Sequence, residues 1–92
     1  MKTIAIIIPT YNEKNNIQKL IYELSSVFID TDYKIHVIVI DDNSPDGTAN
    51  VVRNIPQNDF SVSLITRKEK LGLGSAYLEG YKWCIDNNFQ YI

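Results

Sequence analysis

The sequence has few of the residues that cross-link small proteins or build metal and nucleophile sites. It contains one cysteine, Cys84, and one histidine, His36, in 92 residues. A single cysteine excludes an internal disulfide framework and a cysteine-based metal site. No Ser-His-Asp or Cys-His arrangement can be assembled from this chain. We therefore interpret Cys84 as a buried structural thiol and His36 as a structural residue at the start of a strand.

Long hydrophobic runs and a strong charge are also missing. Residues 4–8 form an apolar run of only five residues that ends at Pro9, so no signal peptide is visible. No segment approaches the roughly 20 apolar residues that span a bilayer. The net charge of -2 argues against a nucleic-acid partner, which would need a basic surface. We expect a cytoplasmic protein, with any peripheral position at the membrane face supplied from elsewhere.

The most informative stretch is a run of β-branched residues that leads directly into two carboxylates. Positions 37–40 read Val-Ile-Val-Ile, and Asp41 and Asp42 follow. An all-apolar run of this kind is typical of a strand buried on both faces of a parallel sheet. Its carboxyl end is where open α/β sheets bind ligands. A helix over residues 45–54 is predicted next, with Ser44 as its N-cap.

Strand and helix patterns alternate along the whole chain. Strands are predicted over residues 3–8, 35–40 and 60–66, helices over residues 13–28, 45–54 and 73–86, and the beginning of a fourth strand over residues 89–92. This order indicates an α/β fold with a Rossmann-like, doubly wound parallel sheet, which we interpret as incomplete. Residues 1–92 are therefore expected to be the first part of one larger domain. An open strand edge makes a homo-oligomer an alternative to a monomer.

The third predicted helix has one apolar face. The residues at helical spacing on that face are Leu73, Ala76, Tyr77, Gly80, Tyr81 and Cys84. The spacing predicts that the two tyrosines are core or interface residues and do not form a ligand platform.

The first candidate site is the segment Pro9-Thr10-Tyr11-Asn12-Glu13 after the first strand. In a doubly wound sheet it would lie beside the end of the second strand, so Glu13 and Asp42 could line one crevice. The ring and hydroxyl of Tyr11 suit a base or a ribose. The alternative is an ordinary strand-to-helix turn, with Asn12 as the N-cap and Glu13 favouring the helix dipole.

The second candidate is the pair Asp41 and Asp42. Such carboxylates can accept hydrogen bonds from ribose hydroxyls or a base N–H, or bind a divalent cation. Because neighbours on an extended strand point to opposite sides, they make a poor bidentate pair. The alternative is a solvated turn.

The third candidate is a basic loop followed by glycines. Arg67, Lys68 and Lys70 precede Gly72 and Gly74, and such a loop could approach a pyrophosphate at the start of a helix. It is not a dinucleotide fingerprint, because it follows the third strand and lacks the third glycine. The alternative is a flexible loop with a solvated basic face.

Together, these motifs resemble the start of glycosyltransferase family 2 enzymes with the GT-A fold. The branch most similar to this chain is that of the polyprenol- or dolichol-phosphate mannosyltransferases, and the resemblance covers essentially all of the chain. It implies a nucleotide-sugar-binding half, in which Pro9, Tyr11 and Glu13 contact the nucleotide of the sugar donor. It also implies that Ile40 and Asp42 hold the base and ribose region, with Asp41 supporting the turn.

The resemblance implies an inverting transfer in which a polyprenyl phosphate oxygen attacks the anomeric carbon of GDP-mannose and GDP leaves. Mg²⁺ or Mn²⁺ would neutralise the departing pyrophosphate. The family's Asp-x-Asp metal motif is expected beyond Ile92, so no catalytic residue or metal ligand is assigned in this chain and the chain alone is expected to be inactive. The alternatives are a UDP-sugar-dependent family 2 transferase of polysaccharide or cell-wall synthesis, or a non-catalytic nucleotide-binding module.

Overall fold

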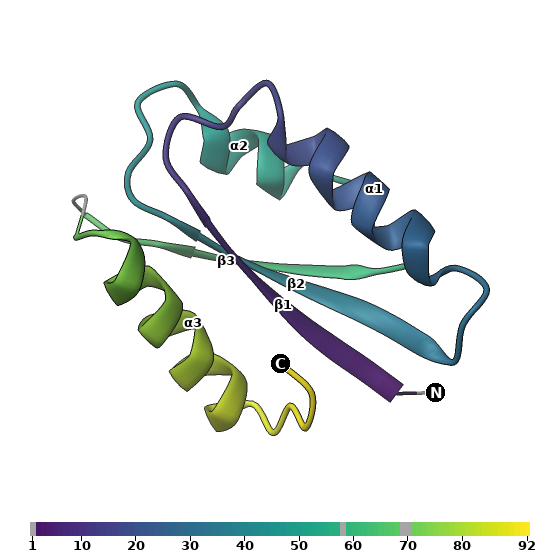
Figure 1. Cartoon of the computed structure of the whole chain (residues 1–92). Coiled ribbons are helices and arrows are strands. Elements are labelled where there is room, and N and C mark those ends of the chain that lie inside the picture. Colours follow the sequence, from purple (N-terminus) through teal and green to yellow (C-terminus); the bar gives the residue numbers. More distant parts are fainter. Residues whose placement is uncertain (1, 58, 69–70) are drawn as a thin grey trace.

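A three-stranded parallel sheet forms the centre of the molecule in the computed structural model, which describes residues 2–57, 59–68 and 71–92. The strands lie in the order β1-β2-β3 (Figure 1). They are β1 (Lys2–Thr10), β2 (Tyr33–Asp41) and β3 (Ser61–Thr66), and the helices between and after them are α1 (Ile17–Phe28), α2 (Thr48–Arg53) and α3 (Leu73–Asp86). The predicted α/β class with a parallel sheet is confirmed.

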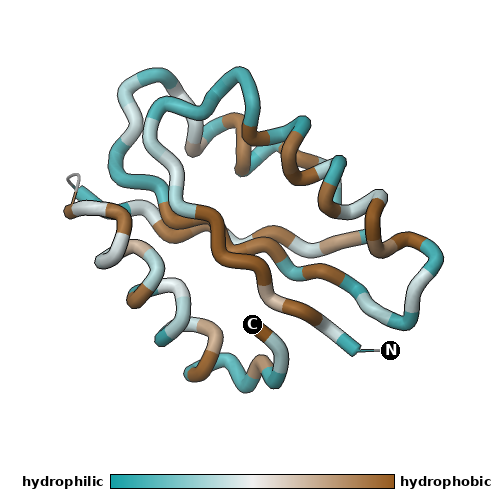
Figure 2. The backbone as a smooth tube through the Cα atoms, viewed as in Figure 1, coloured by the Kyte–Doolittle hydropathy of each residue, from teal (hydrophilic) through white to brown (hydrophobic). Residues whose placement is uncertain are grey.

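The helices cover both faces of the sheet. Figure 1 shows α1 and α2 together on one face and α3 on the other. In β2, Val37 and Val39 face the α1–α2 side, whereas Ile38 and Ile40 face the α3 side. All four are fully buried, as the apolar run predicts for a strand between two helical layers. The loops that join β1 to α1 and β2 to α2 are largely hydrophilic, and the strands are largely hydrophobic (Figure 2).

The segment after α3 returns to the outer edge of β1. Tyr91 forms a parallel bridge with Ile4, and the Ala5 N–H donates to the Tyr91 carbonyl at 2.8 Å. The predicted beginning of a fourth strand is thus observed as a single bridge. Since the chain first steps from β1 to β2 and β3 and then returns past β1, the strand order reverses at β1. The carboxyl end of β1 is therefore the switch point at which doubly wound sheets bind ligands.

The predicted start of α1 is wrong. The helix begins at Ile17, not at Glu13, and Asn12 is not its cap but has a left-handed φ of 58°. The physical reason is tertiary: the Asn12 N–H donates to Ser44 Oγ at 2.9 Å, and the Glu13 N–H donates to Thr48 Oγ1 at 3.0 Å. These contacts hold the segment as a turn before the helix starts.

The predicted start of α2 is wrong for the same reason. The helix begins at Thr48, and Gly47 occupies the N-cap position with a φ of 91°. Ser44 accepts a hydrogen bond from the turn after β1 and is not an N-cap. Asp46 Oδ1 accepts the Thr48 N–H at 3.0 Å, so a carboxylate does satisfy a donor at the start of this helix.

The contact face of α3 is narrower than its apolar pattern suggests. Ala76, Gly80 and Cys84 are buried against the sheet, but Leu73, Tyr77 and Tyr81 are exposed. Of the two predicted roles for the tyrosines, the core role is therefore wrong, and the interface role stays a prediction. A Cβ atom at Gly80 would lie 2.7 Å from Ile7 Cγ2. The helix backbone approaches the sheet so closely at this point that only small side chains fit, and the larger ones turn outward.

Cys84 and His36 are structural, as predicted. Burial raises the pKa of the Cys84 thiol, and Cys84 belongs to the core on the α3 side. His36 Nε2 lies 2.7 Å from Ser63 Oγ, and its ring packs on Phe89 and Trp83. Burial, and secondarily the charge of Lys34, lowers the pKa of His36 below its ordinary value.

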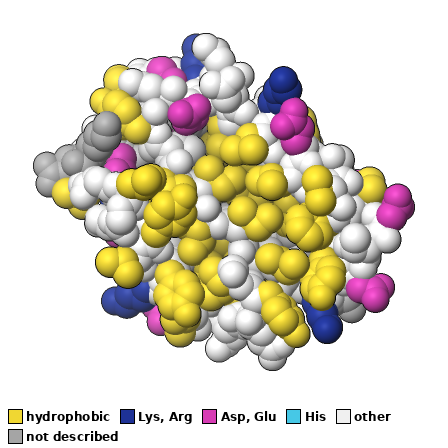
Figure 3. Space-filling model, in the orientation of Figure 1, with side chains coloured by type: hydrophobic (Ala, Val, Ile, Leu, Met, Phe, Trp, Pro, Cys, Tyr) yellow, Lys and Arg dark blue, Asp and Glu magenta, His cyan; other side chains and the backbone are white. Residues whose placement is uncertain are grey.

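The molecular surface along β1 is apolar. Figure 3 shows hydrophobic side chains gathered on the face where β1 lies between α1 and α3 in Figure 1. Among the helices that the structure describes, none has the length and apolar character needed to cross a membrane.

Candidate functional site

A pocket of about 320 Å³ lies at the carboxyl ends of β1 and β2, beside the start of α3. Its lining residues are Pro9, Thr10, Tyr11, Glu13, Asp42, Gly72, Leu73 and Ala76. The structure thus brings four of the six predicted binding residues, Pro9, Tyr11, Glu13 and Asp42, to one cavity at the switch point. Its volume is at the lower end of the about 300–1,000 Å³ that is usual for small-molecule sites.

The other two predicted residues, Ile40 and Asp41, lie behind the pocket. Ile40 is fully buried in the core on the α3 side and is not among the residues that line the pocket. Asp41 Oδ1 accepts hydrogen bonds from Thr10 Oγ1 at 2.8 Å and from Ser44 Oγ at 2.6 Å, and Asp41 Oδ2 accepts the Ser44 N–H at 3.0 Å. Asp41 therefore ties the end of β1 to the loop after β2.

A second set of hydrogen bonds joins the turn after β1 to the loop before α2. Successive main-chain N–H groups of Asn12, Glu13 and Lys14 donate to the side chains of Ser44, Thr48 and Asp46, respectively. A hydrogen bond from the Thr48 hydroxyl lowers the pKa of Asp46 and keeps this acceptor charged. These contacts fix the main chain around Tyr11 and Glu13, which face Asp42 across the pocket.

Asp42 is held by a buried ion pair. Arg67 Nε donates to Asp42 Oδ1 at 2.6 Å, and Arg67 Nη2 donates to Asp42 Oδ2 at 2.8 Å. Asp42 is 6% exposed and Arg67 is 7% exposed. The hydrogen bonds that Arg67 donates to Asp42 raise the pKa of the Arg67 guanidinium, which stays charged. The two alternatives of a solvated acidic turn and a solvated basic face are therefore wrong for Asp42 and Arg67.

The sequence reasoning missed Arg67 as a partner of Asp42. A usable signal was present: Arg67 comes one residue after β3 ends, and Asp42 comes one residue after β2 ends. Because Asp41 pairs with Thr66 in the parallel register, the next residues of both strands must be neighbours. Of the basic loop, Lys70 lies outside the described residues, and Lys68 is exposed.

The site residues do not fit a metal ion. In the described ranges 2–57, 59–68 and 71–92, no group of three or more His, Cys, Asp or Glu side chains is placed to hold one. Asp41 and Asp42 turn to different partners, as expected for neighbours on a strand. The expected Mg²⁺ or Mn²⁺ thus has no ligand set in this part of the chain.

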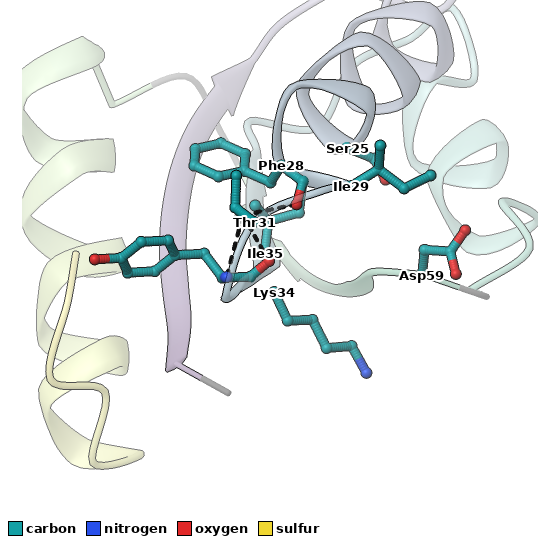
Figure 4. Close-up of a pocket in the computed structure, with 8 residues that line it drawn as sticks. Ser25, Phe28, Ile29, Thr31, Lys34, Ile35 and Asp59 are labelled. Atoms are coloured by element: carbon teal, nitrogen blue, oxygen red, sulfur yellow. Dashed lines mark hydrogen bonds between the residues drawn. The ribbon is translucent and has the colours of Figure 1, made fainter.

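A second cavity, of about 230 Å³, lies at the opposite end of the sheet and does not have the features of a ligand site. It is lined by residues around the α1–β2 connection (Figure 4). Thr31 closes this turn on itself: its hydroxyl donates to the Phe28 carbonyl at 2.7 Å and accepts the Tyr33 N–H at 3.1 Å. Lys34 and Asp59 project from separate segments and do not converge. Ligands of doubly wound sheets bind at the carboxyl ends, which favours the first pocket.

Comparison with known proteins finds relatives in the family that the motifs at this site resemble. Over 88 residues the chain is 33% identical to polyprenol monophosphomannose synthase of Mycolicibacterium smegmatis, covering 95% of this chain and 32% of the relative. Over 89 residues it is 34% identical to undecaprenyl-phosphate mannosyltransferase of Micrococcus luteus, covering 97% of this chain and 35% of that protein. The chain therefore spans 32–35% of the length of these curated relatives. The family model of glycosyl transferase family 2 matches residues 5–91, and the chain belongs to this family.

Proposed function

We propose that this chain binds the nucleotide-sugar donor in an enzyme that transfers mannose from GDP-mannose to a polyprenyl phosphate. The observation that carries the proposal is the pocket at the switch point of the sheet, where Pro9, Tyr11, Glu13 and Asp42 meet. The names of the two relatives, a polyprenol monophosphomannose synthase and an undecaprenyl-phosphate mannosyltransferase, support the choice of sugar and acceptor.

The chemistry of the lining residues suits a nucleoside diphosphate. Tyr11 is 39% exposed and lines the pocket, and its ring can stack on a base or a ribose. Glu13 and Asp42 can accept hydrogen bonds from ribose hydroxyls or from a base N–H. Asp42 Oδ2 also accepts the Leu71 N–H at 3.4 Å, so the carboxylate that lines the pocket is held in place by Arg67 and by the segment before α3.

In the proposed reaction, a phosphate oxygen of the lipid attacks the anomeric carbon of the donor sugar. The bond from that carbon to GDP breaks, and the configuration at the carbon inverts. The described residues bind and orient the donor, and a Mg²⁺ or Mn²⁺ ion would be held by residues outside this chain. Because the acceptor is a lipid, we propose a peripheral position at the cytoplasmic face of the membrane. We expect the 92-residue chain alone to bind the donor without transferring the sugar.

The proposal is tested by calorimetric titration of the chain with GDP, GDP-mannose, UDP and a UDP-sugar. We expect GDP and GDP-mannose to bind, and Tyr11→Ala to weaken GDP binding about tenfold, because stacking on one base contributes about 1–3 kcal/mol. Tyr81→Ala is the matched control, since Tyr81 is 51% exposed and lies outside the pocket.

Each other outcome has a definite meaning. Tighter binding of UDP than of GDP would favour the UDP-sugar-dependent alternative. Equal losses in Tyr11→Ala and Tyr81→Ala, or no binding of any of the four ligands by the unaltered folded chain, would contradict the proposed site.

A further inference from the structure

Arg67 is a buried cation behind the candidate pocket. It is not among the residues that line the cavity, yet its guanidinium is joined to two parts of the cavity wall. The first is Asp42, which it binds through Nε at 2.6 Å and Nη2 at 2.8 Å. This bidentate geometry fixes both the position and the plane of the carboxylate.

The same guanidinium also holds the beginning of α3. Nη1 donates to Ser75 Oγ at 2.8 Å, and Nη2 donates to the Gly72 carbonyl at 3.3 Å. Gly72, with Leu73 and Ala76, forms the α3 side of the pocket. One side chain therefore links Asp42 to the α3 side of the cavity.

Arg67 is itself fixed by the sheet. Its N–H donates to the Asp41 carbonyl at 2.8 Å, which extends the β2–β3 ladder by one residue. The Arg67 side chain is 5% exposed. Only a planar, forked group can reach Asp42, Gly72 and Ser75 together, because a lysine ammonium is a single point on a flexible stem.

We propose that Arg67 is a positioning residue that sets the shape of the donor pocket by holding Asp42 and the first turn of α3 in fixed relation. This proposal rests on the proposed function, in which the pocket binds the nucleoside diphosphate of the donor. Arg67 acts through Asp42 and Gly72 and does not touch the ligand. Without the Arg67 guanidinium, the pocket residues are still present, but Asp42 and the first turn of α3 are no longer held at a fixed distance from each other.

The test compares Arg67→Lys and Ser75→Ala with the unaltered chain. Arg53→Lys is the matched control, because Arg53 is exposed on α2, away from the pocket, and its Nη1 donates to Asn50 Oδ1 at 2.9 Å. Two quantities are measured in each variant: the GDP dissociation constant, and amide hydrogen exchange at Ala76, whose N–H donates to the Gly72 carbonyl at 3.2 Å. Exchange at residues 37–40 reports whether the sheet itself is intact.

We expect Arg67→Lys to raise the GDP dissociation constant about tenfold, since a charge-assisted pair is replaced by a single contact. Exchange at Ala76 should become about tenfold faster while residues 37–40 keep their protection. Ser75→Ala should raise the GDP dissociation constant and the exchange rate at Ala76 by smaller factors. Arg53→Lys should change neither quantity.

An unchanged dissociation constant in folded Arg67→Lys would overturn the proposal, whether or not exchange at Ala76 is faster. If Arg67→Lys does not fold, Ser75→Ala decides by the same two measurements, and unchanged values overturn the proposal. If the unaltered chain binds no nucleotide, the proposed function fails and the role of Arg67 in donor positioning fails with it. If the unaltered chain binds GDP and Arg67→Lys binds it equally well, only the role of Arg67 fails, and the proposed function stands.

Discussion

Asp41 and Asp42 are adjacent at the end of β2, but the strand geometry gives them different partners. Asp41 is 1% exposed and binds Thr10 and Ser44, so it joins the two loops that frame the pocket. Asp42 turns to Arg67 and lines the cavity. Because successive side chains on a strand point to opposite sides, one carboxylate can support the main chain while its neighbour faces a ligand.

His36 carries a prediction about pH at the residue scale. Its pKa is below the ordinary value of 6.5 in the folded chain, first because it is buried and second because Lys34 is near. The unfolded chain therefore binds more protons than the folded chain as the pH falls through 6.5, and the free energy of unfolding falls with it. We expect this loss to begin as the pH falls below about 7 in urea unfolding experiments.

His36→Gln is the comparison for this effect, since glutamine can still hydrogen-bond Ser63 but does not titrate. The variant should be less stable at neutral pH, because contacts with Phe89 and Trp83 are lost. It should also lose less stability than the unaltered chain on acidification. Parallel pH profiles for the two proteins would show that His36 does not contribute.

At the scale of elements, the positions of the strands and of α3 could be predicted from the sequence, but the starts of α1 and α2 could not. The apolar run of β2 follows from burial between two helical layers, so it can be recognised directly in the sequence. The start of α1 depends on hydrogen bonds from Asn12 and Glu13 to residues more than 30 positions away, Ser44 and Thr48. Contacts between residues so far apart leave no pattern in the neighbouring sequence. Asn12 is therefore predicted as an N-cap from its residue type alone.

The candidate site, too, could be predicted from the sequence only in part. Pro9, Tyr11, Glu13 and Asp42 could be placed together from the strand order, because carboxyl ends of parallel strands share one edge. The burial of Arg67 could be predicted only with knowledge of the register of β2 and β3. The outward position of Tyr77 required knowing how closely α3 approaches the sheet at Gly80.

The close contact of α3 with β1 gives a prediction at this scale. Gly80→Ala would place a Cβ atom 2.7 Å from Ile7 Cγ2, so we expect a net loss of stability. Overpacking costs about 1–3 kcal/mol and outweighs the roughly 1 kcal/mol that alanine gains over glycine in a helix. Gly74→Ala, with no atom within 4 Å of the new Cβ, is the control and should be neutral or stabilising. Urea unfolding measures both, and a stabilised Gly80→Ala would contradict the packing described.

At the scale of the whole molecule, the outer edge of β1 and the apolar face beside it are open to association. In the described part of the chain, this edge pairs only with Tyr91. Open edges and apolar faces favour association with a further strand or a second copy. We propose that the isolated chain forms homo-oligomers along this face, which lies along β1 in Figure 3.

Light scattering over a wide range of protein concentrations tests this proposal. The expected result is an average mass that rises with concentration above the 10.6 kDa of one chain. A mass that stays at that of one chain at every concentration would show that the β1 edge does not pair.

The central claim is that the carboxyl ends of β1 and β2 hold the nucleotide of the donor. An experimental structure of the chain with GDP is the most direct measurement. The result we predict is GDP in the pocket at the switch point, with its nucleoside between Tyr11 and Asp42. GDP bound elsewhere, for instance in the cavity beside Phe28 and Lys34, with the first pocket unchanged, would contradict the account.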